Sequence, residues 1–186
     1  MRNLFLSLLV IMGLCACDKE IEDVKLYFIG DSMVANWDVS RFFPSRIVEN
    51  RGKDGIGIKE LSDQQISFPQ DDFIVLVGTN DIKPSMTDEQ LDAYVSQYTE
   101  VIGHLDAKQV FIISVLPTSN AEKNQMIQRF NKHIQKFFSN SSKIIFINCY
   151  DDFERAGVLK DELSRDGLHL NDYGYMLLTE RVKERL

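Results

Sequence analysis

Five short apolar runs recur along the chain, and each predicts a strand. Four of them consist almost entirely of Ile, Val, Leu and Phe, without the alternation of a strand that has one face in water. Such runs are typical of parallel strands that are covered on both faces. The predicted strands are Val24–Ile29, Arg46–Glu49, Phe73–Val77, Val110–Val115 and Lys143–Ile147.

The segments between these runs carry apolar residues at helical spacing. Thr87 and Gln90 have the spacing of a capping box, and residues 91–105 place their apolar side chains on one helical face. A second helix is predicted within 127–138, and a third begins near Asn171. Strands that alternate with helices predict one α/β domain, in which a parallel sheet is covered by helices on both sides.

The first 23 residues follow a different pattern. Residues 4–14 form a mainly apolar run after Arg2, too short for a stable membrane anchor, and this predicts a secretory signal. The run ends in Leu14-Cys15-Ala16-Cys17, which resembles the bacterial lipoprotein box, where cleavage precedes a cysteine that is then lipidated. The alternative is an ordinary cleaved signal peptide. We therefore expect a signal peptide (1–16), a lipidated tether (17–23) and a domain (24–186) of a lipoprotein in the bacterial cell envelope, anchored to a membrane through Cys17.

Charge and cysteine content narrow the possibilities. The formal net charge is −7 and no basic face is evident, which argues against a nucleic-acid partner. If cleavage removes Cys15 and a lipid occupies Cys17, only Cys149 remains and no intrachain disulfide can form. Because Cys149 directly follows an apolar strand, we expect its thiol to be buried and unreactive.

Polar fragments follow three of the predicted strands. They are Gly30-Asp31-Ser32, Asn50-Arg51-Gly52 and Gly78-Thr79-Asn80-Asp81. In open α/β sheets, ligands bind beyond the carboxyl ends of the strands, so the three fragments are predicted to meet at one edge. A fourth fragment, Asp166-Gly167-Leu168-His169, precedes the last predicted helix.

Ser32, His169 and Asp166 are the residue types that a serine hydrolase needs. A base must take the proton of the hydroxyl, and an acid must hold that base in the right tautomer. Asp166 and His169 are three residues apart, so a single turn can bring them together. The alternatives are that Ser32 caps the following helix and that Asp166 and Asn171 cap the last one, with His169 on the surface.

Gly52 and Asn80 are candidate contributors to an oxyanion hole. Attack on an ester turns the carbonyl oxygen into an oxyanion, and the amides of Ser32 and Gly52 and the Asn80 side chain are three possible donors. Glycine at 52 permits a close backbone approach or a positive φ. Asn80 alone is equally typical of a turn.

The four fragments, in this order, resemble the SGNH (GDSL-type) hydrolase family over about residues 26–178. The resemblance implies a flavodoxin-like three-layer α/β/α sandwich with a five-stranded parallel sheet. It also implies ester hydrolysis through an acyl-serine intermediate without a metal or cofactor. In that mechanism Ser32 is the nucleophile, His169 the base and Asp166 its partner, and Gly52 and Asn80 line the oxyanion hole. Lys53-Asp54 departs from the usual small or apolar residues and predicts a more polar pocket.

The substrate is less well defined by the sequence. Trp37 and Pro117 follow strands at the same sheet edge and are candidates for the pocket wall, with core packing as the alternative for Trp37. Short connections predict an open site for small acyl esters, preferably acetyl groups on carbohydrates. The alternatives are a lysophospholipase or thioesterase and a non-catalytic glycan-binding lipoprotein. The glycines of residues 52–57 fit neither a dinucleotide fingerprint nor a phosphate loop.

Overall fold

The structure, a computed structural model, describes residues 24–64 and 66–186. The predicted signal peptide, the predicted tether and Cys17 lie outside the described residues, so these assignments stay predictions. Within the two described ranges, no helix combines the length and the apolar character that crossing a bilayer requires.

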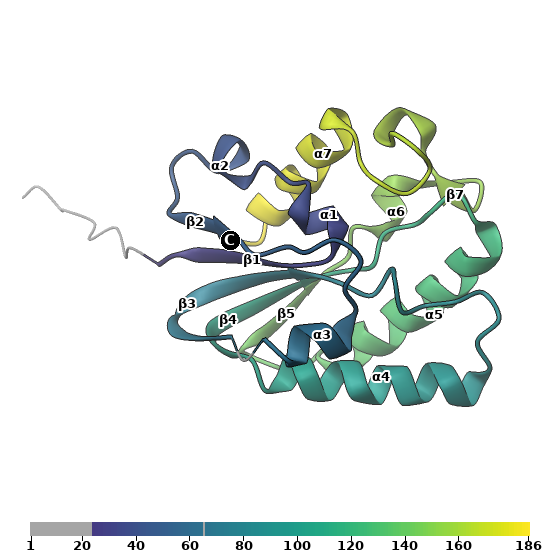
Figure 1. Cartoon of the computed structure of the whole chain (residues 1–186), viewed down its shortest axis with the longest axis horizontal. Coiled ribbons are helices and arrows are strands. Elements are labelled where there is room, and N and C mark those ends of the chain that lie inside the picture. Colours follow the sequence, from purple (N-terminus) through teal and green to yellow (C-terminus); the bar gives the residue numbers. More distant parts are fainter. Residues whose placement is uncertain (1–23, 65) are drawn as a thin grey trace, which may run out of the picture.

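A five-stranded parallel sheet forms the middle layer (Figure 1). Its strand order is β2-β1-β3-β4-β5, and all four neighbouring pairs are parallel. The strands are β1 (Leu26–Gly30), β2 (Val48–Asn50), β3 (Ser67–Leu76), β4 (Asp106–Ile113) and β5 (Ile144–Ile147). Each of the five predicted strands therefore has a counterpart, which confirms the predicted sheet.

Two strands begin earlier than their apolar runs. β3 starts at Ser67 and β4 at Asp106, and these two residues pair with each other. The register then shifts between Phe68 and Asp72. Phe68 stacks on Tyr27 of β1 with ring centroids 4.1 Å apart, so β3 already makes an apolar contact before its buried run begins. The apolar run marks only the part of a strand that is covered on both faces.

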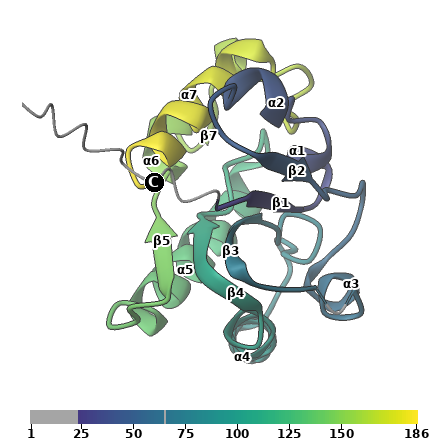
Figure 2. The same cartoon turned by 90° about the vertical axis from the view of Figure 1, so that its left-hand side faces the viewer.

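Helices cover both faces of the sheet, as Figures 1 and 2 show. One face carries α3 (Ile58–Ser62), α4 (Asp88–Gly103) and α5 (Ala121–Phe137). The other carries α1 (Ser32–Ala35), α2 (Val39–Phe42), α6 (Tyr150–Phe153) and α7 (Asp172–Lys183). A small hairpin of β6 (Glu154–Arg155) and β7 (Val158–Leu159) and a short 3₁₀ helix (Asp161–Leu163) lie between α6 and α7 in the chain. The three-layer α/β/α prediction is confirmed.

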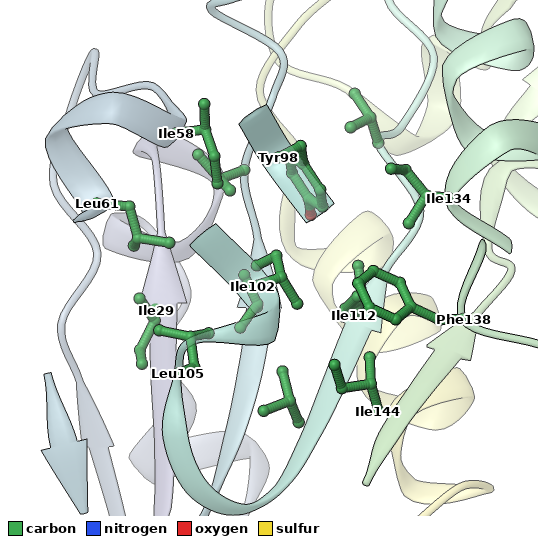
Figure 3. Close-up of a cluster of buried hydrophobic side chains, with 14 of the residues drawn as sticks. Ile29, Ile58, Leu61, Tyr98, Ile102, Leu105, Ile112, Ile134, Phe138 and Ile144 are labelled. Carbon is green, nitrogen blue, oxygen red and sulfur yellow. The ribbon is translucent and has the colours of Figure 1, made fainter. Parts of the chain in front are cut away.

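An apolar core fills the space between the sheet and the layer of α4 and α5 (Figure 3). Ile102 of α4 and Ile134 of α5 are fully buried against Ile112 of β4. Phe138, just after α5, is also buried, whereas the neighbouring Phe137 is 63% exposed. Of these two neighbouring aromatic residues, Phe138 therefore belongs to the buried face.

The predicted helix starts are also observed. Thr87 accepts a hydrogen bond from the Gln90 backbone, and the Gln90 side chain accepts one from the Thr87 backbone, as in a capping box. Asn171 caps α7 by accepting a hydrogen bond from the Gly174 backbone at 3.0 Å. This cap fixes where α7 begins, and thereby fixes the position of the fragment that ends at His169.

Candidate active site

Ser32 lies at the junction of β1 and α1. Asp31 is the N-cap of α1: its Oδ1 accepts a hydrogen bond from the Met33 amide at 3.0 Å. Its backbone carbonyl accepts further bonds from the amides of Val34 and Ala35. The alternative that Ser32 itself caps this helix is therefore wrong. The Ser32 hydroxyl is left available for another role.

Asp166 holds His169 by both of its carboxylate oxygens. Oδ1 accepts hydrogen bonds from the backbone amides of Leu168 at 3.0 Å and His169 at 2.7 Å, while Oδ2 lies 2.7 Å from the His169 Nδ1. The His169 side chain and these two amides hold the pKa of the Asp166 carboxyl down at about 2. A carboxylate that is ionised and receives this bond places the proton of the neutral imidazole on Nδ1.

A tight turn keeps these two residues in place. Ser164 Oγ accepts a hydrogen bond from the Gly167 amide at 2.8 Å and donates one to the His169 carbonyl at 3.1 Å. Gly167 has a φ of +81°, and a Cβ at this position would lie 2.7 Å from the Ser119 Oγ. Glycine meets both requirements, the left-handed backbone and the close approach.

The structure brings the first and last fragments together. His169 Nε2 lies 3.1 Å from Ser32 Oγ, although 137 positions separate the two residues. With the proton on Nδ1, the Nε2 lone pair faces the hydroxyl, which is the arrangement of a base beside a nucleophile. The side chain of His169 is 28% exposed and that of Asp166 is 52% exposed, so solvent reaches the site.

The other titratable candidates lie elsewhere. His104 and His133 are both exposed, on α4's C-cap and on α5 respectively. Cys149 is fully buried and its amide donates a hydrogen bond to Ser114 Oγ at 2.9 Å. Burial raises the pKa of its thiol to about 12, so the thiol stays protonated and unreactive, as expected from its place after a strand.

The three candidate oxyanion donors have different environments. The Ser32 amide lies in the first turn of α1 and donates no hydrogen bond to any described residue. One Asn80 Nδ2 hydrogen is donated to the Ile56 carbonyl at 2.8 Å, and the second hydrogen of that amide remains available. The Gly52 amide, by contrast, donates to Asn50 Oδ1 at 2.8 Å. Two donors are thus free and the third is engaged.

Gly52 is required for packing. A Cβ there would lie 2.2 Å from the backbone nitrogen of Ala35, so the chain after β2 passes directly against α1. The predicted close approach is observed. The alternative, a positive φ, is not, because Gly52 is absent from the glycines with positive φ.

An open cavity of about 520 Å³ contains the site. Its lining includes four predicted residues and five others: Ser32, Asn80, Asp166 and His169, with Asn36, Asp54, Gly55, Arg165 and Leu168. Of the charged pair Lys53-Asp54 that predicted a more polar pocket, Asp54 lines the cavity and Lys53 does not. Asn36 and Arg165 were missed by sequence reasoning, although Asn36 lies one helical turn after Ser32 and Arg165 directly precedes Asp166. These spacings were the available signals.

Trp37 and Pro117 do not line this cavity, and their prediction as pocket walls is wrong. Trp37 is 1% exposed, and the centroid of its ring lies 5.1 Å from that of Phe28. Its Nε1 donates a hydrogen bond to Thr179 Oγ1 at 3.2 Å. Pro117 is also buried. A large aromatic ring beside a short helix is buried because the sheet face beneath it needs an apolar cover. The open alternative, core packing, is correct for Trp37.

A buried carboxyl lies directly beneath the nucleophile. Asp31 is fully buried, and among the described residues its Oδ2 has no hydrogen-bond partner. Burial raises the pKa of Asp31 to about 6. The hydrogen bond from the Met33 amide lowers this pKa, and the nearby charge of Asp81 raises it further. Asp81 is satisfied, because it accepts bonds from the Ile58 amide and the Tyr94 hydroxyl. Both acids support the backbone around the site and neither lines the cavity.

Asp31→Asn is expected to become more stable relative to wild type as the pH rises. In wild type the folded carboxyl, with a pKa of about 6, binds its proton more tightly than the unfolded one. Its contribution to stability is therefore fully present below the unfolded pKa and is lost as the pH rises to about 6. The shift of about two units corresponds to about 3 kcal/mol. Urea unfolding between pH 4 and pH 8 should show the free-energy difference between the two proteins growing by most of this amount.

Asp38→Asn is the matched control for this titration. Asp38 is an exposed helix cap whose pKa is lowered by hydrogen bonds from Ser40 and from the Arg41 backbone. Its ionised form is favoured by folding, so the variant should lose stability relative to wild type as the pH rises, the opposite trend. A difference between Asp31→Asn and wild type that does not vary with pH would contradict a proton held by buried Asp31.

The chain resembles known proteins over most of its length. Residues 28–177 match the model of the GDSL-like Lipase/Acylhydrolase family. A Streptococcus pneumonia protein provisionally described as a platelet activating factor has 26% identity and a TM-score of 0.75, over 90% of this chain and 86% of that one. No curated protein sequence matches the chain.

Two further solved structures share the fold at lower identity. A GDSL-like lipase from Bacteroides thetaiotaomicron has 21% identity and a TM-score of 0.68, over 88% of each chain. An acetylxylan esterase from Geobacillus stearothermophilus has 16% identity and a TM-score of 0.68, over 87% of this chain and 93% of that one. At these identities the likeness concerns the fold alone. The family match spans all four sequence fragments, from Gly30 to His169, and most of the chain. The chain therefore belongs to the GDSL-like lipase/acylhydrolase family.

Proposed function

We propose that the protein hydrolyses small acyl esters, with Ser32 as the nucleophile, His169 as the base and Asp166 as its orienting acid. The observation that carries the proposal is the chain of two contacts, 3.1 Å from Ser32 Oγ to His169 Nε2 and 2.7 Å from His169 Nδ1 to Asp166 Oδ2. Nδ1 of His169 bonds the carboxylate and Nε2 faces the hydroxyl, which is the arrangement that general-base catalysis requires.

The reaction then proceeds in two halves. Ser32 Oγ attacks the ester carbonyl while its proton passes to His169 Nε2, and the carbonyl oxygen becomes an oxyanion. The Ser32 amide and the Asn80 side chain are its two proposed donors. Gly52 becomes the third if its amide leaves Asn50. As the ester bond breaks, the alcohol departs with the proton from His169, and water then cleaves the acyl-serine with His169 as base to release the acid.

The lining of the cavity favours a small acyl group on a polar alcohol. Leu168 is the one apolar side chain among the nine lining residues, whereas Asp54 and Arg165 carry opposite charges. A long acyl chain needs an extended apolar wall, which this lining does not supply. An acetyl ester of a carbohydrate matches it better. The fold similarity to an acetylxylan esterase supports this choice by analogy only.

Esters of graded acyl length test the proposal. The domain should hydrolyse p-nitrophenyl acetate with a higher kcat/KM than p-nitrophenyl palmitate, release acetate from acetylated glycans, and react with a fluorophosphonate at Ser32. Preference for palmitate or for a lysophospholipid would support the alternative acylhydrolases. Absence of both hydrolysis and labelling would support a glycan-binding protein without catalysis.

Asn80→Ala is expected to lower kcat by about 10²- to 10³-fold, the scale for the loss of one oxyanion donor. The Asn80 amide interacts with the oxygen most strongly when that oxygen is charged, so KM should change little. Steady-state kinetics on p-nitrophenyl acetate measure the two constants separately. Asn140→Ala, at an exposed asparagine in the turn after α5, is the control and should match wild type. A change confined to KM would argue against the oxyanion role.

We also propose that the protein is a lipoprotein of the bacterial cell envelope, anchored to a membrane through Cys17. The support is the apolar run of residues 4–14 and the Leu14-Cys15-Ala16-Cys17 box that ends it. Mass spectrometry of the protein from its membrane fraction should find a diacylglyceryl modification on an N-terminal Cys17. An unmodified N-terminus after a different residue would indicate an ordinary signal peptide.

A further inference from the structure

A second cavity adjoins the catalytic one. It measures about 370 Å³ and shares Asn36 and Arg165 with the cavity that contains Ser32. The remaining lining comes from the residues just before α7 and from its first turn: Leu170, Asn171, Asp172, Tyr173 and Tyr175. Because two residues belong to both cavities, a molecule whose ester lies at Ser32 can extend into the second one without leaving the surface.

Tyr173 gives this second cavity an aromatic wall. The side chain is 68% exposed, the highest value among the large hydrophobic residues on the described surface. The next aromatic residue on α7, Tyr175, is buried, and its hydroxyl donates to the Met33 carbonyl at 2.8 Å. One tyrosine thus ties α7 to α1 while the other presents its ring to solvent. An exposed ring beside a cavity can stack on the C–H face of a pyranose.

Polar groups that suit a sugar lie around this ring. Within the described residues, the Arg165 guanidinium has no hydrogen-bond or ion-pair partner, so its donors are available to hydroxyl groups. The Asn36 Nδ2 donates to the Ser32 carbonyl at 2.7 Å, which leaves its Oδ1 free to accept. Asp172, which also lines the cavity, accepts a hydrogen bond from Arg41 at 3.2 Å.

We propose that this second cavity is a subsite for a sugar ring next to the acylated one, with Tyr173 stacking on that ring and Arg165 and Asn36 binding its hydroxyls. The inference rests on the proposed esterase function and deepens it. It specifies an oligosaccharide, rather than a free monosaccharide or a simple alkyl ester, as the preferred alcohol portion. The occupied length would be at least two rings, one at Ser32 and one at Tyr173.

The test compares acetylated xylobiose with acetylated methyl xyloside, a two-ring and a one-ring ester of the same sugar. Wild type should prefer the two-ring ester. Tyr173→Ala should reduce this preference, the ratio of the two kcat/KM values, by about tenfold, the scale of one aromatic contact. Tyr173→Phe keeps the ring and should restore the ratio. A merely structural role for Tyr173 would lower both values together and leave the ratio constant.

Phe137→Ala provides the matched control. Phe137 is 63% exposed at the end of α5, on the opposite face of the sheet, so its removal should leave the ratio unchanged. Unacetylated xylobiose should also inhibit hydrolysis of p-nitrophenyl acetate, with a Ki about tenfold higher in Tyr173→Ala.

The outcomes separate the two proposals. If wild type hydrolyses both sugar esters and Tyr173→Ala keeps the two-ring preference, the subsite is wrong and the esterase function stands. If wild type hydrolyses p-nitrophenyl acetate but neither sugar ester, the glycan substrate and the subsite both fail. If nothing is hydrolysed, the esterase function itself fails.

Discussion

Ser32→Ala is expected to lower kcat on p-nitrophenyl acetate by about 10⁴-fold or more, in line with the removal of a serine nucleophile in other hydrolases. The variant keeps the Ser32 amide donor and the binding cavity, but it has no oxygen to form the acyl intermediate. His169 Nε2 then has no hydroxyl at 3.1 Å to deprotonate. The remaining rate should reflect only direct attack by water.

The fold should tolerate this substitution. The Ser32 hydroxyl contacts the His169 ring and caps no helix, because Asp31 caps α1. The unfolding transition of the variant should therefore resemble that of wild type. Ser40→Ala removes an exposed hydroxyl whose one hydrogen bond within residues 24–64 and 66–186 is to Asp38, and it should retain full activity. Labelling by a fluorophosphonate should disappear from Ser32→Ala and persist in the control. An Ser32→Ala protein with substantial activity would refute the mechanism.

The fold could be predicted from the sequence because buried parallel strands leave a strong pattern. Each apolar run that is covered on both faces corresponds to the buried part of a strand, as residues 73–76 do in β3. The polar beginnings of β3 and β4 left no such pattern, since they pair at the rim of the sheet, where side chains face solvent. The four-residue helices α1 and α2 are shorter than the repeat that reveals a helix.

The reacting residues were predictable for a different reason. Ser32, Asp166 and His169 occupy ordered fragments, so residue type and order indicated them before any contact was known. The walls of the cavity carry no comparable pattern. Trp37 follows Ser32 closely in sequence, yet its ring turns into the core, whereas the adjacent Asn36 faces the cavity. Which of two neighbouring residues reaches the substrate depends on a helical rotation that sequence order does not specify.

The same distinction applies to the oxyanion donors. Asn80 reaches the cavity, but the Gly52 amide donates to Asn50 instead. Position 52 requires glycine because the chain there passes close to the Ala35 backbone. The sequence thus identified a residue whose identity matters, while its engagement with a neighbouring side chain could be found only from the three-dimensional arrangement.

Asp166→Asn is expected to lower kcat by about 10³- to 10⁴-fold, through a change in the tautomer of His169. Through its Oδ1, Asn can still accept hydrogen bonds from the backbone amides of Leu168 and His169, so the turn should persist. Its Nδ2 would then face His169 Nδ1 as a donor. This favours the imidazole with its proton on Nε2, toward Ser32, where it cannot act as the base. The loss of the carboxylate also removes the charge that stabilises the imidazolium in the transition state.

The pH dependence and a control variant distinguish this cause from a general disturbance. Asp161→Asn changes an exposed carboxylate in the short helix before the turn, outside the cavity, and should keep wild-type kinetics. If Asp166 acts only by holding the turn, Asp166→Asn keeps both amide bonds and should leave kcat and the unfolding midpoint nearly normal. If it sets the tautomer, kcat falls while the unfolding midpoint barely changes. Rising pH should then not restore kcat to wild type, because deprotonation of the imidazolium yields the unproductive tautomer.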